Sequence, residues 1–281
     1  QCIVALCIVD LHVSHQSETS NLITSVIMTP NFSIIIPTYN HLALAQRAID
    51  SVRSQEGVSM EIIVCDDSTD NRIEQYVMGL HDDRINYHHN RPQLGAVGNW
   101  NEGLGKVTGT YGIVLHHDEA LVGNNYLAQL LHVMRQTNAD IAVSEVHVMI
   151  GEKQKKRHFP SRLKRWMLHH PTTLFGLNAI GPCACVAFRC DKRQAFHEPL
   201  QWLVDVEWYY RMLRASAIVY YPTLIVESAH DHEGQISRSI HIYQAWQHDA
   251  KIIGTMHKGI SLRLMLAIGK TIMTVKQQFG R

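Results

Sequence analysis

Two histidines and two acids follow a short apolar run near the middle of the chain. The apolar residues 112–115 predict a buried strand, and the side chains that follow it are His116, His117, Asp118 and Glu119. In open α/β sheets, ligands bind at the C-terminal ends of the strands. Imidazole and carboxylate groups suit Mn²⁺, and carboxylates suit Mg²⁺. The stretch therefore predicts a cation and ligand site, and a strand that runs into a solvated polar turn is the alternative.

Two further pairs of acids could reach the same cleft. Asp66 and Asp67 follow the strand predicted at residues 61–65, and an acid after such a strand can accept hydrogen bonds from a base or a ribose. Asp205 and Glu207 lie at the start of a predicted helix, where the helix dipole by itself favours an acid. Because side chains two residues apart on a helix diverge by roughly 200°, we expect at most one of this pair to reach a bound hydroxyl group.

Strand and helix signals alternate through the first half of the chain. Buried strands are predicted at residues 32–36, 61–65, 84–89, 111–115 and 140–148. Helices are predicted at residues 42–55, 73–80 and 124–136, and a glycine-bearing helix follows the loop that starts at Asn90. Units of this length indicate a parallel sheet with right-handed crossovers.

The residue composition changes after Ile150, where basic residues become frequent. Residues 151–170 carry seven Lys and Arg against one Glu, which is typical of a solvated loop or helix face; attraction to phosphates or to an anionic membrane is the functional alternative. Residues 183–190 predict a strand with Cys183 and Cys185 on one face, residues 202–215 a helix, and residues 217–228 a long strand or a strand pair. From residue 240 onward the chain is predicted to be helical and basic, with an apolar stripe suited to core packing or to peripheral membrane attachment.

Composition excludes several classes of protein. The chain has 281 residues, of which 46% are hydrophobic and 18% charged, and a formal charge of +1 gives no general basic field for a nucleic acid. No stretch is apolar for long enough to span a membrane. The six cysteines form no CxxC pair, which favours reduced, packed thiols in a cytosolic protein. Residues 1–27 precede Met28 and the first strand, so we expect an extension outside the fold.

Five motifs occur in order between residues 32 and 239: FSIIIPTYN, EIIVCDDSTD, NRPQLGAVGNWNEGL, YGIVLHHDE and WLVDVEWYYR. Together they resemble the family 2 glycosyltransferases of the GT-A fold. The resemblance implies an α/β, Rossmann-like, mostly parallel sheet flanked by helices over residues 28–238. Within this domain it implies a nucleotide-sugar-binding half (32–150) and an acceptor half (151–238). A basic amphipathic helical extension would follow at residues 239–281.

The resemblance also implies roles for single residues. Asp118 matches the acid that ends the family's DxD motif, His116 stands at the position of its first Asp, and Asp205 matches the general base of inverting members. Further metal ligands would come from Glu119 and His232, and Glu207 stands beside the base. The nucleotide-sugar site would comprise Pro37, Thr38, Tyr39, Asn40, Asp66, Asp67, Arg91, Gly95, Asn99, Asn101 and His117.

The implied activity is transfer of a sugar, with inversion, from a nucleotide-diphosphate donor to a glycan or lipid-linked acceptor at the cytoplasmic face of a membrane, in cell-surface polysaccharide synthesis. The expected cofactor is Mn²⁺ or Mg²⁺, and the expected donor is a UDP-sugar, with dTDP- and GDP-sugars as alternatives. Two other classes stay open. One is a catalytically silent nucleotide-sugar-binding scaffold, and the other is a nucleotidyltransferase, whose glycine-rich first loop is missing here.

Overall fold

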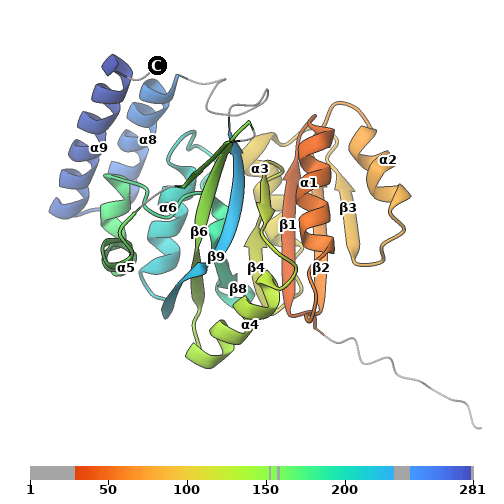
Figure 1. Cartoon of the computed structure of the whole chain (residues 1–281). Coiled ribbons are helices and arrows are strands. Elements are labelled where there is room, and N and C mark those ends of the chain that lie inside the picture. Colours follow the sequence, from red (N-terminus) through yellow and green to blue (C-terminus); the bar gives the residue numbers. More distant parts are fainter. Residues whose placement is uncertain (1–28, 152, 157–158, 231–240, 280–281) are drawn as a thin grey trace, which may run out of the picture.

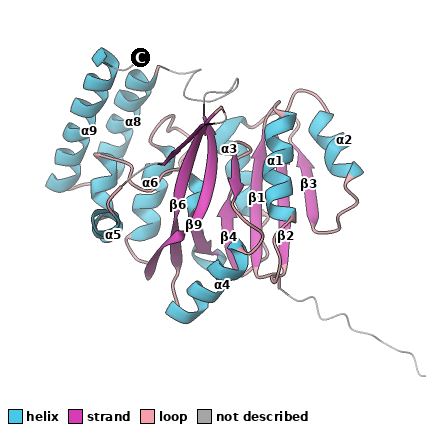
Figure 2. Cartoon of the chain, in the orientation of Figure 1, coloured by secondary structure: helices cyan, strands magenta, loops and turns pink. Residues whose placement is uncertain are grey.

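A single mixed sheet forms the centre of the molecule (Figures 1 and 2). The computed structural model describes residues 29–151, 153–156, 159–230 and 241–279, so residues 1–27 and His232 lie outside the described part of the chain. The strands of the sheet run in the order β3-β2-β1-β4-β8-β6-β9-β5, with β7 on β6. Their bounds are β1 Phe32–Thr38, β2 Met60–Asp66, β3 Ile85–His89, β4 Tyr111–Val114, β5 Glu119–Leu121, β6 Ile141–Ile150, β7 Lys153–Lys156, β8 Val186–Arg189 and β9 Ile218–His230.

The predicted parallel sheet is confirmed for one half of the molecule. Strands β3, β2, β1 and β4 pair in parallel, and so do β6 and β9. Strand β8 is antiparallel to both β4 and β6. Strand β5 pairs antiparallel with β9, and β7 pairs antiparallel with β6. The sheet is therefore mixed, and its parallel pairs lie in the half that precedes β5 and between β6 and β9.

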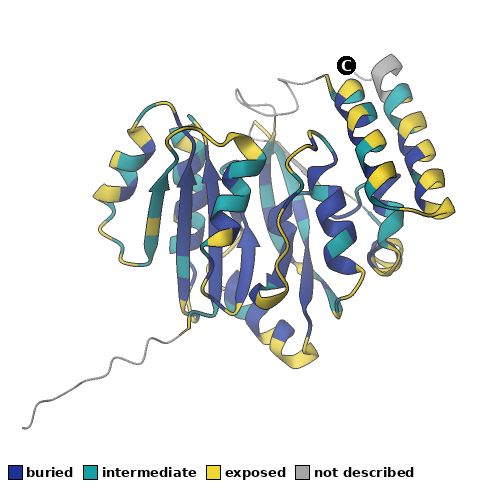
Figure 3. Ribbon diagram, turned by 180° about the vertical axis from the view of Figure 1, so that it is seen from behind, coloured by how far each residue is buried: buried dark blue, intermediate teal, exposed yellow. Residues whose placement is uncertain are grey.

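Helices cover both faces of the sheet. Their bounds are α1 Leu42–Arg53, α2 Arg72–Gly79, α3 Gly95–Gly105, α4 Tyr126–Thr137, α5 Ser161–His169, α6 Val204–Leu213, α8 Ile242–Met256 and α9 Ile260–Phe279. Helices α1 and α3 lie on opposite faces of the parallel strands (Figures 1 and 3) because the chain reverses its direction across the sheet after β3. Covered from both sides, β1 is buried along its whole length, as its continuous apolar run predicts.

The segment expected as a strand at residues 183–190 is shorter than predicted. A 3₁₀ turn, Cys183–Cys185, precedes β8, and another, Cys190–Lys192, follows it. The prediction that Cys183 and Cys185 alternate along a strand is therefore wrong, because both lie in the first turn. The thiols of Cys65, Cys183, Cys185 and Cys190 are free and buried, as expected.

The last two helices form a C-terminal helical hairpin against the body. Trp246 and Ile253 of α8 and Leu262 of α9 are buried, and the backbone of Gly269 passes close to Trp246 and to the carbonyl of Phe175. Phe175 belongs to a 3₁₀ turn, Pro171–Phe175, that follows α5. Within the described residues, we find no helix with the length and apolar character to cross a membrane.

Candidate functional site

The C-terminal ends of β1, β2 and β4 meet at one edge of the sheet. The parallel register sets Thr38 beside Asp66, and Asp66 beside His89. The amide of Leu115 donates to the carbonyl of Ile35, so the chain leaves β4 next to β1. This edge is where the sequence predicts a ligand site.

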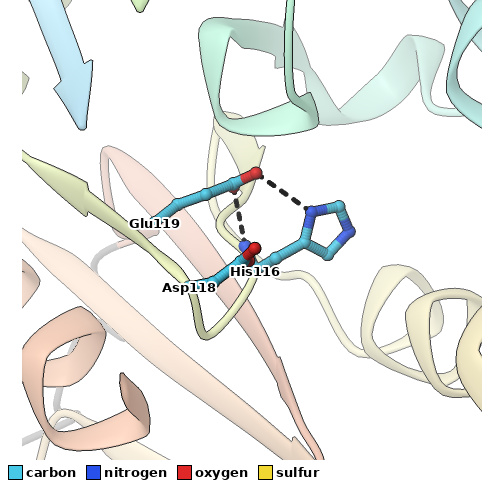
Figure 4. A group of neighbouring side chains, drawn as sticks. All are labelled: His116, Asp118 and Glu119. Carbon is cyan, nitrogen blue, oxygen red and sulfur yellow. Dashed lines mark hydrogen bonds and ion pairs between the residues drawn. The ribbon is translucent and has the colours of Figure 1, made fainter. Parts of the chain in front are cut away.

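A compact group of ligating atoms follows β4 (Figure 4). The Glu119 carboxylate accepts a hydrogen bond from the backbone N–H of His116 at 2.9 Å and contacts the His116 Nδ1 at 3.2 Å. A nitrogen of His116 and carboxylate oxygens of Asp118 and Glu119 lie within 4.8 Å of one another. The prediction that these three side chains gather at the strand end is confirmed as geometry.

The donor set of this group fits a divalent cation. Glu119 is 2% exposed, and burial raises its pKa. Burial also acts to lower the pKa of His116, but the charge and hydrogen bond of Glu119 outweigh it, so the pKa of His116 is raised. Because Nδ1 faces Glu119, the other ring nitrogen, Nε2, is left for a ligand; it is buried without a hydrogen-bond partner among the described residues. A ligand beside Nε2 would satisfy this buried nitrogen.

Asp205 lies in the electrostatic neighbourhood of this group. It stands in the first turn of α6, and its charge is one of those that raise the pKa of His116. Its Oδ2 accepts a hydrogen bond of 3.0 Å from the side-chain amide of Asn178. The Oδ1 of Asn178 accepts the backbone N–H groups of Ile180 and Gly181, and its Nδ2 also donates to the carbonyl of Gly181, so Asp205 has a fixed partner.

Glu207 is not brought to the same place. Its side chain is fully buried and accepts hydrogen bonds of 2.7 Å from Arg211 Nε and 2.8 Å from His257 Nε2. His257 directly follows α8, so Glu207 faces the C-terminal hairpin. In this arrangement it has no access to a bound hydroxyl group.

The two acids after β2 are committed to hydrogen bonds within the protein. Asp66 accepts from the hydroxyls of Thr38, Ser68 and Tyr87. Asp67 accepts the backbone N–H groups of Leu94 and Gly95, both at 2.8 Å, at the start of α3. Their carboxylates thus shape the loops around the cleft; contact with a base stays a prediction.

The predicted nucleotide-sugar residues fall into two groups. Asn99 donates to the carbonyl of Cys65 at 2.9 Å, and Asn101 makes two hydrogen bonds with the backbone of Phe196, so both amides fix the frame. Gly95 has φ of +74°, which favours glycine, at the position where its N–H meets Asp67. The remaining predicted residues lie in β1 or in the loops around the cleft: Pro37, Tyr39, Asn40, Arg91 and His117.

Three aromatic rings that sequence reasoning did not single out pack in succession beside His116. The ring of Trp100 lies 4.5 Å from that of His116 and 5.2 Å from that of Phe196, which stacks on Trp208 at 4.7 Å. Trp100 stands within the motif NWN, where its position beside Asn99 and Asn101 was the available signal. Arg47 of α1 was also missed; it donates to the carbonyl of Asp118 and to Glu227 of β9.

Comparison with solved structures identifies the fold. TarS from S. aureus in complex with UDP-GlcNAc matches with a TM-score of 0.64 and 15% identity over 90% of this chain and 74% of that chain. A mannosyltransferase from Pyrobaculum calidifontis in complex with GDP-Man and Mn²⁺ matches with a TM-score of 0.60 and 16% identity over 91% of this chain and 77% of that chain. The architecture is thus that of the GT-A glycosyltransferases.

Comparison with curated sequences points the same way. A GalNAc(5)-diNAcBac-PP-undecaprenol β-1,3-glucosyltransferase of Campylobacter jejuni is 36% identical over 96 residues, which is 33% of this chain and 31% of that protein. An uncharacterised glycosyltransferase of Rickettsia typhi is 25% identical over 86% of this chain and 77% of that protein. A putative colanic acid biosynthesis glycosyl transferase of Escherichia coli is 32% identical over 44% of this chain and 45% of that protein. Residues 33–198 match the sequence profile of Glycosyl transferase family 2, and the chain therefore belongs to that family.

Proposed function

We propose that this chain transfers a sugar from a nucleotide-diphosphate donor, with a UDP-sugar first among the candidates, to a hydroxyl group of a glycan or lipid-linked acceptor, with inversion at the anomeric carbon. The observation that supports it most is the group of ligating atoms that His116, Asp118 and Glu119 form after β4, where the charge of Asp205 also acts on His116. A carboxylate and a cation-binding group are what a single displacement needs.

The proposed reaction gives one task to Asp205 and another to the group of His116, Asp118 and Glu119. Asp205 accepts the proton of the acceptor hydroxyl as its oxygen bonds to the anomeric carbon, a contribution of roughly 10² to 10⁴-fold in rate. The bond from that carbon to the diphosphate breaks, and its electron pair leaves with the nucleoside diphosphate. Asn178 holds Asp205 in place through the 3.0 Å hydrogen bond to Oδ2.

The metal side of the proposal rests on a ring nitrogen of His116 and the carboxylates of Asp118 and Glu119, which lie within 4.8 Å of one another. A bound Mn²⁺ or Mg²⁺ would supply positive charge that stabilises the departing diphosphate. The ring of Trp100 packs against His116 and excludes water from one side of the imidazole. Support for a metal also comes from the Mn²⁺ in the mannosyltransferase neighbour.

Calorimetry with UDP, GDP and dTDP, each with and without Mn²⁺, followed by release of the nucleoside diphosphate from a panel of donor sugars, tests this function. We expect metal-dependent binding of one nucleoside diphosphate and slow hydrolysis of its sugar conjugate. Binding without turnover of any donor would favour the scaffold, and preference for a nucleoside triphosphate would favour a nucleotidyltransferase.

The finer proposal on location is that α9 rests on an anionic membrane surface at the cytoplasmic face. Ile260, Leu264, Ile268 and Val275 are exposed, and their spacing sets them within about 80° of one another around the helix. The buried side chains Leu262 and Leu266 point the opposite way, toward the body. An exposed apolar stripe of this kind is typical of a helix that lies in a membrane interface.

Basic residues accompany this stripe. Lys258, Arg263 and Lys270 are exposed, and the last two line, with Lys251 of α8, a hollow of about 450 Å³ between the two helices. Each basic residue near an anionic surface contributes about 1 kcal/mol. Such a location would bring the enzyme to a lipid-linked acceptor.

A further inference from the structure

A buried acid of the C-terminal hairpin is bound to the backbone that precedes α6. The side chain of Asp249, in α8, is completely buried. Its carboxylate accepts the N–H groups of Gln201 at 3.0 Å, Trp202 at 2.6 Å and Leu203 at 2.7 Å. Leu203 is the residue immediately before the first residue of α6. One side chain therefore satisfies three successive backbone donors of the segment that enters the helix.

The arrangement is strong for two physical reasons. Hydrogen bonds to a charged acceptor contribute about 1.5–3 kcal/mol each, and backbone donors that lose a buried partner cost about 1–3 kcal/mol. A negative charge at the N-terminus of a helix is also favoured by the helix dipole. The segment 201–203 is thus fixed by α8, which lies 46 to 48 residues further along the chain.

The fixed segment leads directly to the proposed base. Asp205 is the second residue of α6, two positions after Leu203, so a shift of Leu203 moves the Asp205 carboxylate relative to its partner Asn178. A second contact holds the same helix to the hairpin, because Glu207 accepts a hydrogen bond from His257 at the end of α8. Two contacts therefore attach α6 and the residue before it to α8 and the residue after it: Leu203 to Asp249, and Glu207 to His257.

These contacts lie outside the segment that carries the family signature. The family profile matches residues 33–198, whereas α6 and both of its partners in the hairpin follow residue 198. The sequence led us to treat residues 239–281 as an extension, and the described part of that extension instead reaches the start of α6.

We propose that Asp249 is a positioning residue for the transfer reaction: by holding residues 201–203 it sets the orientation of Asp205, which makes α8 part of the catalytic unit. This proposal rests on the proposed function, in which Asp205 is the general base. It concerns orientation only, since Asp249 is buried beneath the segment and has no access to substrate.

The test compares full-length Asp249→Asn with the wild type, using the donor sugar that the donor screen identifies. Asn keeps the size of the side chain but brings an NH₂ group against backbone donors, so residues 201–203 shift. We expect the rate constant for donor hydrolysis to fall at least tenfold, while the dissociation constant for UDP with Mn²⁺ stays within twofold. Gln244→Ala, an exposed change on the same helix, is the matched control and keeps the wild-type rate constant.

A second variant decides the matter if Asp249→Asn does not fold. Asp249→Glu keeps the charge and so keeps the helix attached, but its extra methylene displaces the carboxylate. We expect it to lower the rate constant with UDP affinity unchanged. A folded variant of either kind that loses only thermal stability and turns over at the wild-type rate would overturn the positioning role.

Failure of this inference is separable from failure of the proposed function. If Asp205→Asn keeps the wild-type rate of donor hydrolysis, the base assignment is wrong, and the positioning role falls with it. If Asp205→Asn is inactive while the folded Asp249 variants keep full activity, only the positioning role is wrong.

Discussion

Glu119 holds His116 by two contacts, one to the backbone N–H and one to Nδ1 of the ring. This pairing occupies Nδ1 of the imidazole and directs Nε2 away from the acid. A histidine oriented by a buried carboxylate is a common metal-ligand arrangement, and the acid raises the basicity of the ligating nitrogen. Neutral imidazole adds no negative charge, however, so the site suits Mn²⁺ better than Mg²⁺.

Replacing His116 by Asp should change the metal preference. His116→Asp adds a negative oxygen ligand, so we expect Mg²⁺ affinity in the presence of UDP to rise about tenfold relative to Mn²⁺, as hard oxygen ligands favour Mg²⁺. Without metal, the new carboxylate meets Glu119 and should lower the thermal midpoint. Calorimetry and thermal unfolding in EDTA measure both effects, with the exposed His132→Asn on α4 as the control. An unchanged ratio of the two affinities would show that His116 is not a ligand.

The predictable part of the site consists of side chains at the ends of strands and helices. The ending of the strand before His116 and the helical position of Asp205 could both be read from the sequence. The spacing showed that Asp205 and Glu207 diverge, and the family resemblance selected Asp205. Apart from Ser68, which lies two positions from Asp66, the partners of Asp66, Asp67 and Asn99 could not be read, because they come from residues 9 to 61 positions away, brought near only by the fold.

The close approach of α3 to β1 positions the Trp100 ring beside His116. Gly103 of α3 faces Ile35, and a Cβ added at Gly103 would lie 2.2 Å from the Cγ2 of Ile35. The same helix carries Trp100, whose ring packs against His116. A displacement of α3 would therefore shift the ring that packs against His116.

Substitution of Gly103 by Ala should destabilise the protein by about 1–3 kcal/mol, because the extra methyl overpacks the contact with β1. Gly105→Ala, in the last turn of the same helix, is the matched control, since nothing lies within 4 Å of its added Cβ. There the gain in helix propensity should stabilise by up to about 1 kcal/mol. Urea unfolding measures both changes, and equal effects of the two substitutions would contradict the close packing.

At the level of elements, the sequence predicts the strands that are buried along their length and misses those decided by pairing. Residues 32–36 and 61–65 read as strands because both faces are apolar. Strand β5 has three residues and β7 is a basic edge strand, so neither has a pattern of its own, and each exists through its antiparallel neighbour.

The C-terminal hairpin takes part in both proposed roles of the whole molecule, positioning of Asp205 and contact with a membrane. One side of it contacts α6, and the other side carries the exposed apolar stripe. The contacts to α6 come from α8, through Asp249 and His257. The stripe belongs to α9. Sequence periodicity could identify α9 as amphipathic, but it could not tell which of its apolar residues face the body.

Vesicle binding tests the membrane proposal. The double change Ile260→Ser and Leu264→Ser should reduce co-sedimentation with vesicles containing anionic phospholipid at least fivefold, because both exposed side chains lose their apolar contact. Met78→Ser, at an equally exposed apolar position on α2, is the control and should bind like the wild type. Wild-type binding that is equal for anionic and neutral vesicles, or absent from both, would contradict the proposal.

The central claim is that Asp205 acts as the base opposite a cation-binding group. The most direct measurement is the rate of nucleoside diphosphate release by Asp205→Asn, set beside its affinity for the same nucleoside diphosphate with Mn²⁺. Asp191→Asn, an exposed acid remote from the cleft, serves as the control. The account predicts a loss of roughly 10² to 10⁴-fold in rate with affinity nearly unchanged. Weakened binding with an unchanged rate for the bound donor would contradict it.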